Sequence, residues 1–97
     1  MTCLLRPEAR DELNRAALYY EELREDLGDE FIEDFLLAIT EIEEAPSRWP
    51  EIEVGIRRFR MSRFPYALVY RVRSSAIDII AVAHLSRREG YWRDRPK

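Results

Sequence analysis

The chain has 97 residues, of which 46% are hydrophobic and 11% aromatic, and this composition is typical of a single globular domain over residues 1–97. No apolar run is long enough to cross a bilayer, and the first residues do not form a secretory signal, so we expect a cytoplasmic protein. With one cysteine, Cys3, and one histidine, His84, the sequence excludes a disulfide framework and most zinc sites. We expect neither a metal nor a cofactor.

The net charge of −3 conceals a strong difference between the two halves of the chain. Residues 1–54 carry 16 acidic side chains and 5 arginines, whereas residues 55–97 carry 11 basic side chains and 3 acidic ones. Nearly all of the basic residues are arginines, whose planar guanidinium suits bidentate contact with phosphate or carboxylate. Charge alone leaves two interpretations open: a basic functional face on an acidic scaffold, or two halves that neutralise each other across the fold.

The acidic half predicts two helices. Pro7 suits the first position of a helix, and apolar residues then recur at spacings of three and four, at Ala9, Leu13, Ala16, Tyr20, Leu23 and Leu27. Gly28 is expected to end this helix, and Asp29 to cap a second helix that ends near Pro46. The second helix has its apolar stripe at Ile32, Phe35, Ile39 and Ile42. Because the connection is so short, we expect an antiparallel helical hairpin.

In the second half the apolar period changes to two, which predicts strands. We expect them at residues 55–61, 66–73 and 76–85, with turns at 63–65 and 74–75, and a short strand at 3–5 before the helices. The fold class is therefore α+β in the order β-α-α-β-β-β. An N-terminal strand and the helical hairpin pack on one face of a three- to four-stranded antiparallel sheet, and a short C-terminal tail follows.

The other sheet face has no helix to cover it, and polar side chains are expected there at Arg58, Arg60, Arg71, Arg73 and His84. Such a row of arginines favours binding of nucleic acid or of an acidic peptide, and the alternative is a solvated outer face balanced by the acidic helices. His84 is either an acid–base group or the polar end of a strand. In the tail, Tyr91 and Trp92 alternate with arginines, so they either stack on a partner or anchor the C-terminus.

Five segments together resemble the RelE/ParE superfamily of type II toxin–antitoxin toxins, also called plasmid stabilisation proteins. They are Arg-Pro-Glu-Ala-Arg-Asp-Glu-Leu at 6–13, Gly-Ile-Arg-Arg-Phe-Arg at 55–60, Phe-Pro-Tyr-Ala-Leu-Val-Tyr-Arg-Val at 64–72, Ile-Ile-Ala-Val-Ala-His at 79–84, and Tyr-Trp-Arg-Asp-Arg at 91–95. The resemblance covers essentially the whole chain. It implies the same β-α-α-β-β-β fold that the periodicity predicts.

The resemblance implies one of two activities. RelE-like members cleave messenger RNA on the ribosome without a metal, and the corresponding catalytic residues here would be Arg58, Arg60, Arg71, His84, Arg87 and Tyr91. However, those ribonucleases carry arginines at the positions held here by Ala67 and Leu85, and the loss of two charges near the scissile phosphate weakens this interpretation. ParE-like members instead poison DNA gyrase by binding to it.

We therefore expect a ParE-like toxin that inhibits growth by acting on DNA gyrase and is neutralised in a hetero-oligomer with a cognate antitoxin. The acidic, partly disordered tail of such an antitoxin folds when it binds. Binding of antitoxin or target is expected at Arg57, Arg58, Arg60, Arg73, Arg88, Trp92 and Arg93. The alternatives are a ribosome-dependent endoribonuclease, in which case the protein is an enzyme, and an inactive module that only binds an antitoxin.

Overall fold

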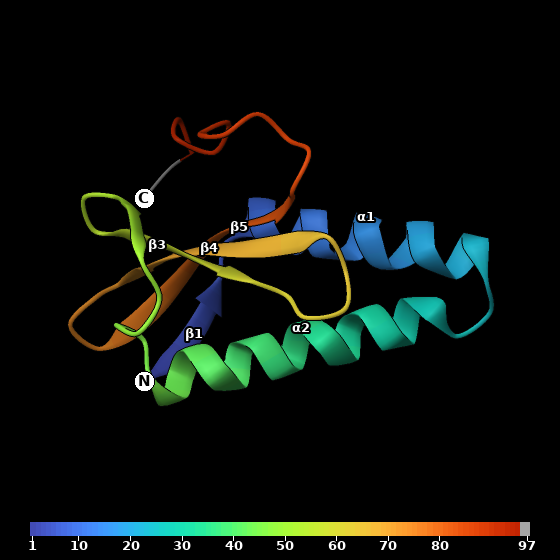
Figure 1. Ribbon diagram of the computed structural model, residues 1–97, viewed down its shortest axis with the longest axis horizontal. Coiled ribbons are helices and arrows are strands. Elements are labelled where there is room, and N and C mark those ends of the chain that lie inside the picture. The colour runs from blue at the N-terminus through green and yellow to red at the C-terminus, as the bar shows by residue number, and fades with distance from the viewer. Residues whose placement is uncertain (96–97) are drawn as a thin grey trace.

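The computed structural model describes residues 1–95 and shows the expected α+β fold, with a helical hairpin on one face of a sheet (Figure 1). Its elements are β1 (Thr2–Leu5), α1 (Pro7–Leu23), α2 (Leu27–Glu44), β2 (Glu51–Glu53), β3 (Ile56–Arg60), β4 (Tyr66–Val72) and β5 (Ala76–His84). Neither helix is both long enough and apolar enough to span a membrane within the residues described.

The sheet has five strands in the order β1-β5-β4-β3-β2, one strand more than the sequence predicts. The additional strand, β2, is only three residues long, carries two glutamates and follows Pro50, so it has too little apolar alternation to be recognised. The pairs β2–β3, β3–β4 and β4–β5 are antiparallel, whereas β1 runs parallel to β5. β1 and β5 are the first and last strands of the chain, and both helices and the three other strands lie between them in the sequence.

The turn between the helices lies before Gly28, and the predicted helix end at Gly28 is wrong. The chain turns at Arg24–Asp26, and Asp26 adopts the left-handed conformation with φ of 70°. Gly28 instead lies in the first turn of α2, where a Cβ atom would stand only 2.6 Å from the carbonyl oxygen of Ala17. The glycine is therefore needed for the close approach of the two helices rather than for a helix end.

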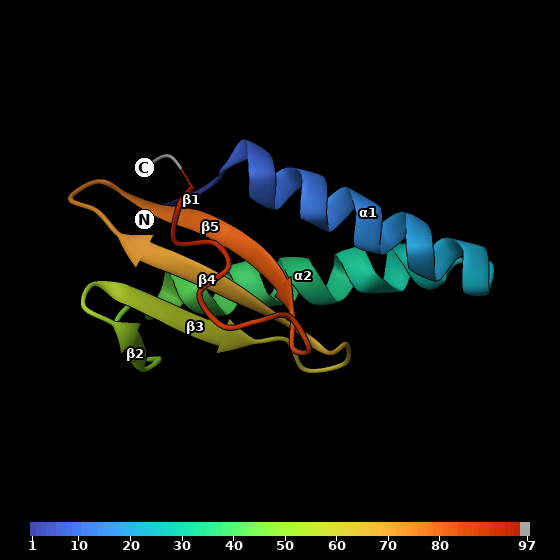
Figure 2. The ribbon, with the colours of Figure 1, turned by 90° about the horizontal axis from the view of Figure 1, so that it is seen from above.

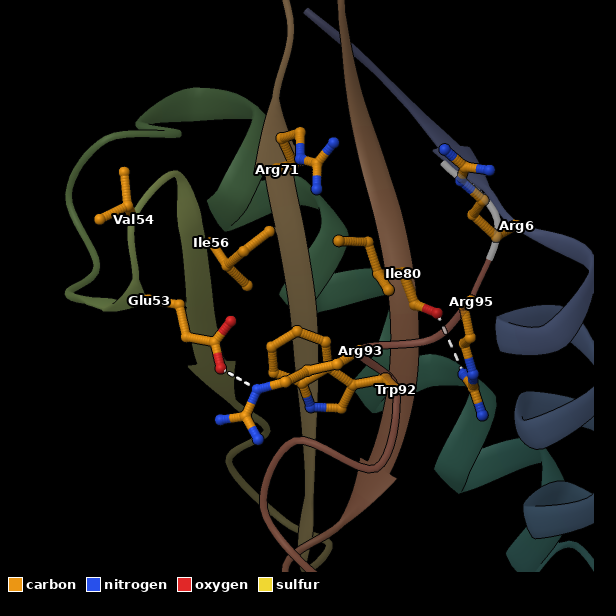
Figure 3. Close-up of a pocket in the computed structure, with 9 residues that line it drawn as sticks. All are labelled: Arg6, Glu53, Val54, Ile56, Arg71, Ile80, Trp92, Arg93 and Arg95. Carbon is orange, nitrogen blue, oxygen red and sulfur yellow. Dashed lines mark hydrogen bonds and ion pairs between the residues drawn. The ribbon is translucent and has the colours of Figure 1, made fainter.

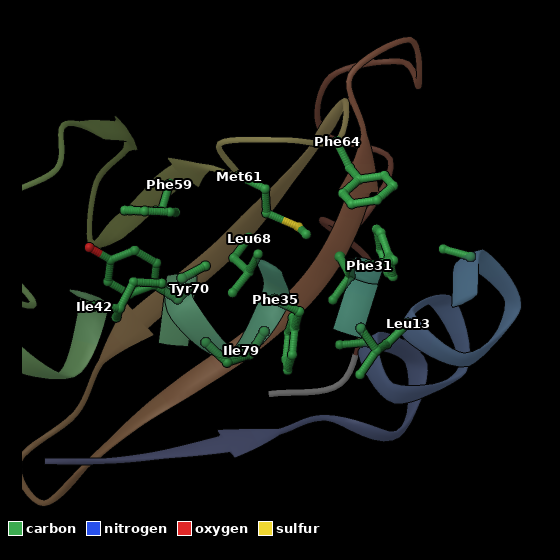
Figure 4. Packing of buried hydrophobic residues seen from close by; sticks show 14 of the residues in the cluster. Leu13, Phe31, Phe35, Ile42, Phe59, Met61, Phe64, Leu68, Tyr70 and Ile79 are labelled. Atoms are coloured by element: carbon green, nitrogen blue, oxygen red, sulfur yellow. The ribbon is translucent and has the colours of Figure 1, made fainter. Parts of the chain in front are cut away.

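The main core lies between the hairpin and the sheet (Figure 4). Leu68 and Tyr70 of β4 face the helices, as their alternation predicts, and pack with Phe31 and Phe35 of α2. The Tyr70 hydroxyl donates a hydrogen bond to the Pro46 carbonyl at 2.7 Å, so this buried phenol is satisfied. The predicted stripe of α1 is buried at Ala9, Leu13 and Ala16 but not at its end: Leu23 is 61% exposed, because the helical hairpin extends beyond the sheet (Figure 1).

The C-terminal tail crosses the sheet face that the helices leave uncovered (Figure 2). Trp92 of the tail is 6% exposed and packs with Ile56, Val69, Ile80 and Ala81 in a second, smaller core. Adjacent residues of a regular strand face opposite sides of the sheet, yet Ile80 and Ala81 of β5 both belong to this second core. The reason is a register shift in the β4–β5 pairing, opposite Val69 and Tyr70, which interrupts the alternation of side chains. The anchoring interpretation of Trp92 therefore agrees with its position in the structure.

A buried carboxylate joins α2 to the loop between β3 and β4. Asp34 is 1% exposed, and it accepts hydrogen bonds from the Ser62 hydroxyl at 2.8 Å and from the Arg63 backbone N–H at 2.9 Å. The polar pattern of the sequence gave no sign of this contact, because Asp34 stands among several acidic residues on α2.

Replacing Asp34 with alanine should lower the free energy of unfolding by about 2–4 kcal/mol, because both donors lose a buried charged acceptor. Asp29→Ala, an exposed position on the same helix, is the matched control and should change stability by less than about 1 kcal/mol. Urea unfolding followed by circular dichroism measures both. Equal effects for the two variants would contradict the structural role of Asp34.

Candidate functional site

The sheet face opposite the helices, which we call the open face, contains two cavities separated by Trp92. The first, the His84 cavity, has a volume of about 200 Å³ and is lined by Arg58, His84, Arg87, Arg88, Tyr91 and Trp92, among others. The second, the Arg71 cavity, has a volume of about 250 Å³ and is lined by Arg6, Arg71, Arg93, Arg95, Glu53 and Trp92, among others (Figure 3). Both cavities are rich in guanidinium groups.

The six predicted catalytic residues are divided between these cavities. Four of them line the His84 cavity: Arg58, His84, Arg87 and Tyr91. Arg71 lines the other cavity, and Arg60 is exposed at the end of β3 and lines neither. Ala67 and Leu85, which stand where the ribonucleases have arginines, also line the His84 cavity. The cavity therefore lacks two cations at these positions.

Tyr91 is held by neighbours on three sides. Its hydroxyl donates a hydrogen bond to Oε2 of Glu12 at 2.6 Å. The guanidinium carbons of Arg87 and Arg95 lie 3.8 Å and 5.0 Å from the centre of its ring. Burial first, and then the hydrogen bond to the negative carboxylate of Glu12, raise the pKa of Tyr91 far above its ordinary value of 10. The phenol is thus neutral at neutral pH.

Glu12 of α1 is the centre of this network. Its Oε1 accepts the backbone N–H of Val82 at 3.0 Å, and both of its oxygens accept hydrogen bonds from Arg95, at 2.9 Å and 2.8 Å. Arg95 also donates to the carbonyl of Ile80 at 3.1 Å (Figure 3). Burial alone would raise the pKa of Glu12, but the hydrogen bonds from Arg95, Tyr91 and Val82 outweigh it and lower the pKa below its usual range.

Sequence reasoning missed Glu12, although a signal was present. Glu12 stands three residues after Ala9 and four before Ala16, so it shares the inward face of α1 with buried alanines. An acidic residue at such a position needs a partner inside the fold. That partner, Arg95, lies at the opposite end of the chain, and no local pattern identifies it.

Several arginines predicted to bind an antitoxin or target have partners within the protein. Arg57 donates to the carbonyl groups of Ser47 and Trp49, at 3.1 Å and 2.6 Å, and holds the loop before β2. The ion pairs in this group are Arg57–Glu51 at 3.3 Å, Arg58–Glu89 at 3.7 Å, Arg73–Asp78 and Arg93–Glu53. Within residues 1–95, the arginines of the second half that form no ion pair are Arg60, Arg71, Arg87 and Arg88.

His84 lies at the end of β5 with its ring against Tyr66, at 5.0 Å between ring centres. Its Nδ1 accepts the backbone N–H of Ser86 at 3.0 Å, which leaves Nε2 as the nitrogen without a partner among the residues described. Among these residues, no group of three histidine, cysteine, aspartate or glutamate side chains is arranged to hold a metal ion.

Comparison with known proteins identifies the family and agrees with the fold. The model of the family described as "ParE toxin of type II toxin-antitoxin system, parDE" matches residues 4–89, and the chain belongs to this family. A comparison with curated proteins found no match. Among solved structures, the chain is similar to one described as "Chromosomal ParDE TA system from P. aeruginosa", with a TM-score of 0.76 and 17% identity, over 87% of this chain and 95% of that one. At this identity, the structural similarity supports the fold alone.

The Glu12–Arg95 pair should make stability depend on pH in the acid range. Because the pKa of Glu12 is lowered from 4.5 by folding, its ionised form stabilises the fold above pH 4.5, and this contribution is lost as pH falls through the lowered pKa. Glu12→Gln should therefore cost about 1–3 kcal/mol at pH 7 and show a shallower loss of stability below pH 4.5 than the unmodified protein.

The control is Asp11→Asn, which removes an exposed ion pair with Arg15 on the same helix and should cost no more than about 0.5 kcal/mol. Urea unfolding at several pH values between about 3 and 7 measures the difference. If Glu12→Gln and the unmodified protein lost stability in parallel below pH 4.5, the ionised Glu12 would not be the stabilising group.

Proposed function

We propose that this protein inhibits growth by binding DNA gyrase, and that a cognate antitoxin neutralises it in a hetero-oligomer. Membership of the ParE toxin family supports the toxin role, and the solved relative is described as part of a ParDE system. The observation that carries the choice of a binding activity is the lining of the His84 cavity. Ala67 and Leu85 stand there at the positions where the ribonucleases carry arginines, so two of the charges that would stabilise the scissile phosphate are missing.

The open face supports a binding role because some of its arginines have no acidic partner among residues 1–95. Arg87 and Arg88 are exposed on the tail, and neither forms an ion pair within residues 1–95. Guanidinium groups in such a position contribute to steering and docking of an acidic partner. The same charges suit an acidic segment of an antitoxin, so neutralisation follows if the antitoxin covers the arginines that the target needs.

Charge reversal tests which surface is used. Arg88→Glu should reduce the toxicity of the chain expressed alone in a bacterium, and should reduce cleaved gyrase–DNA complexes formed with the purified protein at least about tenfold. Arg10→Glu makes the same charge change at an exposed position of α1 that lines neither cavity of the open face, and it should leave both readouts unchanged. Equal losses for the two variants, or intact gyrase activity with the unmodified protein, would contradict the proposal.

A second candidate function, ribosome-dependent cleavage of messenger RNA, is favoured by one observation. The His84 cavity brings Arg58, His84, Arg87 and Tyr91 together on one face of the sheet. If these groups cleave RNA, Tyr91 and His84 act as acid and base. The absence of a cation at Ala67 and Leu85 argues against it, because the charge of the pentacovalent phosphate would be poorly stabilised.

Tyr91→Phe separates the two functions. It removes only the hydroxyl that bonds Glu12, so under the gyrase proposal growth arrest and a DNA-damage reporter signal should persist, with stability lower by about 1 kcal/mol. Primer extension on messenger RNA should show no new ends with either this variant or the unmodified chain. His84→Ala serves as the second variant. New ribosome-dependent cuts that both variants abolish would establish the ribonuclease and overturn the gyrase proposal.

A further inference from the structure

The Arg71 cavity has a property that the proposed function does not use: an apolar floor beside a cation without an anion. Ile56, Ile80 and Trp92 form the floor, and they belong to the second core (Figure 3). Arg71 of β4 reaches the cavity from one side, while Arg93 and Arg95 of the tail and Arg6 lie around it (Figure 3). The volume of about 250 Å³ is suited to a ligand of one small ring or one side chain.

Three of the four arginines around this cavity already have partners. Arg93 pairs with Glu53, Arg95 pairs with Glu12, and Arg6 lies 3.4 Å from Oδ2 of Asp78. Arg71 is half-buried, and its side chain makes no hydrogen bond or ion pair with any of residues 1–95. It is therefore the one lining cation, within this part of the chain, that is available to a ligand.

The carboxylate nearest to Arg71 in the sheet does not neutralise it. Asp78 is the cross-strand partner of Arg71, but its Oδ2 is shared between Arg73 and Arg6. Burial would raise the pKa of Asp78, but the two arginines lower it, so its carboxylate is negatively charged. This one negative charge already faces the positive charges of Arg73 and Arg6 before Arg71 is counted. The surroundings of the cavity thus keep an excess of positive charge.

We propose that the Arg71 cavity binds a carboxylate joined to an apolar group, with the carboxylate on Arg71 and the apolar group on Ile56, Ile80 and Trp92. A guanidinium presents two parallel N–H donors that match the two oxygens of a carboxylate. A single available arginine suits a single negative charge better than a phosphate dianion. This inference does not depend on gyrase or antitoxin binding, because it concerns only the affinity of the cavity itself.

Titration of the full chain with phenylacetate tests the proposal. Binding is measured by NMR, from the signals of the Arg71 side-chain N–H and the Trp92 indole N–H. Both signals should shift in a saturable way. Phenylacetamide, which has the same shape without the charge, should bind at least about tenfold more weakly. Arg71→Gln should weaken phenylacetate binding by about tenfold or more, and Arg71→Lys should restore only part of it. Thermal unfolding of each variant confirms that it is folded.

The matched control is Arg88→Gln, which removes the same charge from the His84 cavity and should change the affinity for phenylacetate less than about twofold. A comparison of two probes identifies the source of the carboxylate. One is acetyl-Gly-Phe with a free C-terminus, and the other is phenylacetate. If the peptide binds more tightly, the natural ligand is the end of a polypeptide; if phenylacetate binds more tightly, it is a free carboxylic acid. Both orders support the carboxylate site.

Three results would overturn the proposal. The first is the absence of a saturable shift at Trp92 and Arg71 with any of the carboxylates. The second is equal binding of phenylacetamide, which would define a purely apolar cavity. The third is equal binding of sulfate at Arg71, or an equal effect of Arg88→Gln, since either would define a general anion-attracting surface. None of these results bears on gyrase binding, which the assays of the preceding subsection measure separately.

Discussion

The open face depends on the way in which α1 and the tail complete the edge of β5. β1 pairs with β5 only along Ala76–Ile79, so the remainder of β5 would present unpaired backbone groups at this edge. Glu12 accepts the Val82 N–H and Arg95 donates to the Ile80 carbonyl, and the two side chains then pair with each other. Two side chains thus replace a strand along this edge. The same contacts fix the tail over the sheet, where Trp92 divides the face into two cavities.

Among residues 1–95, the charge asymmetry is neutralised across the fold for some residues and leaves unpaired arginines at others. Acidic groups of the first half pair with arginines of the second half at Glu12–Arg95, Glu30–Arg63, Glu51–Arg57 and Glu53–Arg93, so part of the asymmetry is neutralised across the fold. Within residues 1–95, Arg60, Arg71, Arg87 and Arg88 remain without an acidic partner. The surplus lies largely on the open face, because the acidic residues are concentrated on helices that lie on the other side of the sheet (Figure 2).

Periodicity was sufficient to predict the elements that bury a regular face, and it failed where a single close contact decides the structure. The alternation of Leu68, Val69 and Tyr70 assigned each side chain to the correct face of β4. Gly28 was misassigned, because a glycine at a helix end and a glycine at a helix crossing look alike in sequence. Nor did the sequence reveal which arginines are engaged, since Arg57 and Arg58 are neighbours with similar patterns but different partners. Whether an arginine forms an ion pair depends on which side chains lie near it in the folded protein, and local sequence patterns do not contain this information.

The strand order also constrains when the protein can acquire its native form. β5, the last strand to emerge during synthesis, lies between β1, the first, and β4. Neither β1 nor the contacts of Glu12 can reach their partners until β5 and the tail have been translated, so the sheet closes through contacts between the two ends of the chain. A nascent chain that stops before β5 lacks the contribution of Ile77, Ile79 and Val82 to the main core, and it lacks Ile80, Ala81 and Trp92 of the second core. Under the proposed function, toxicity that depends on the open face arises only after the final strand and the tail have been translated, and a neutralising antitoxin has this interval in which to be made.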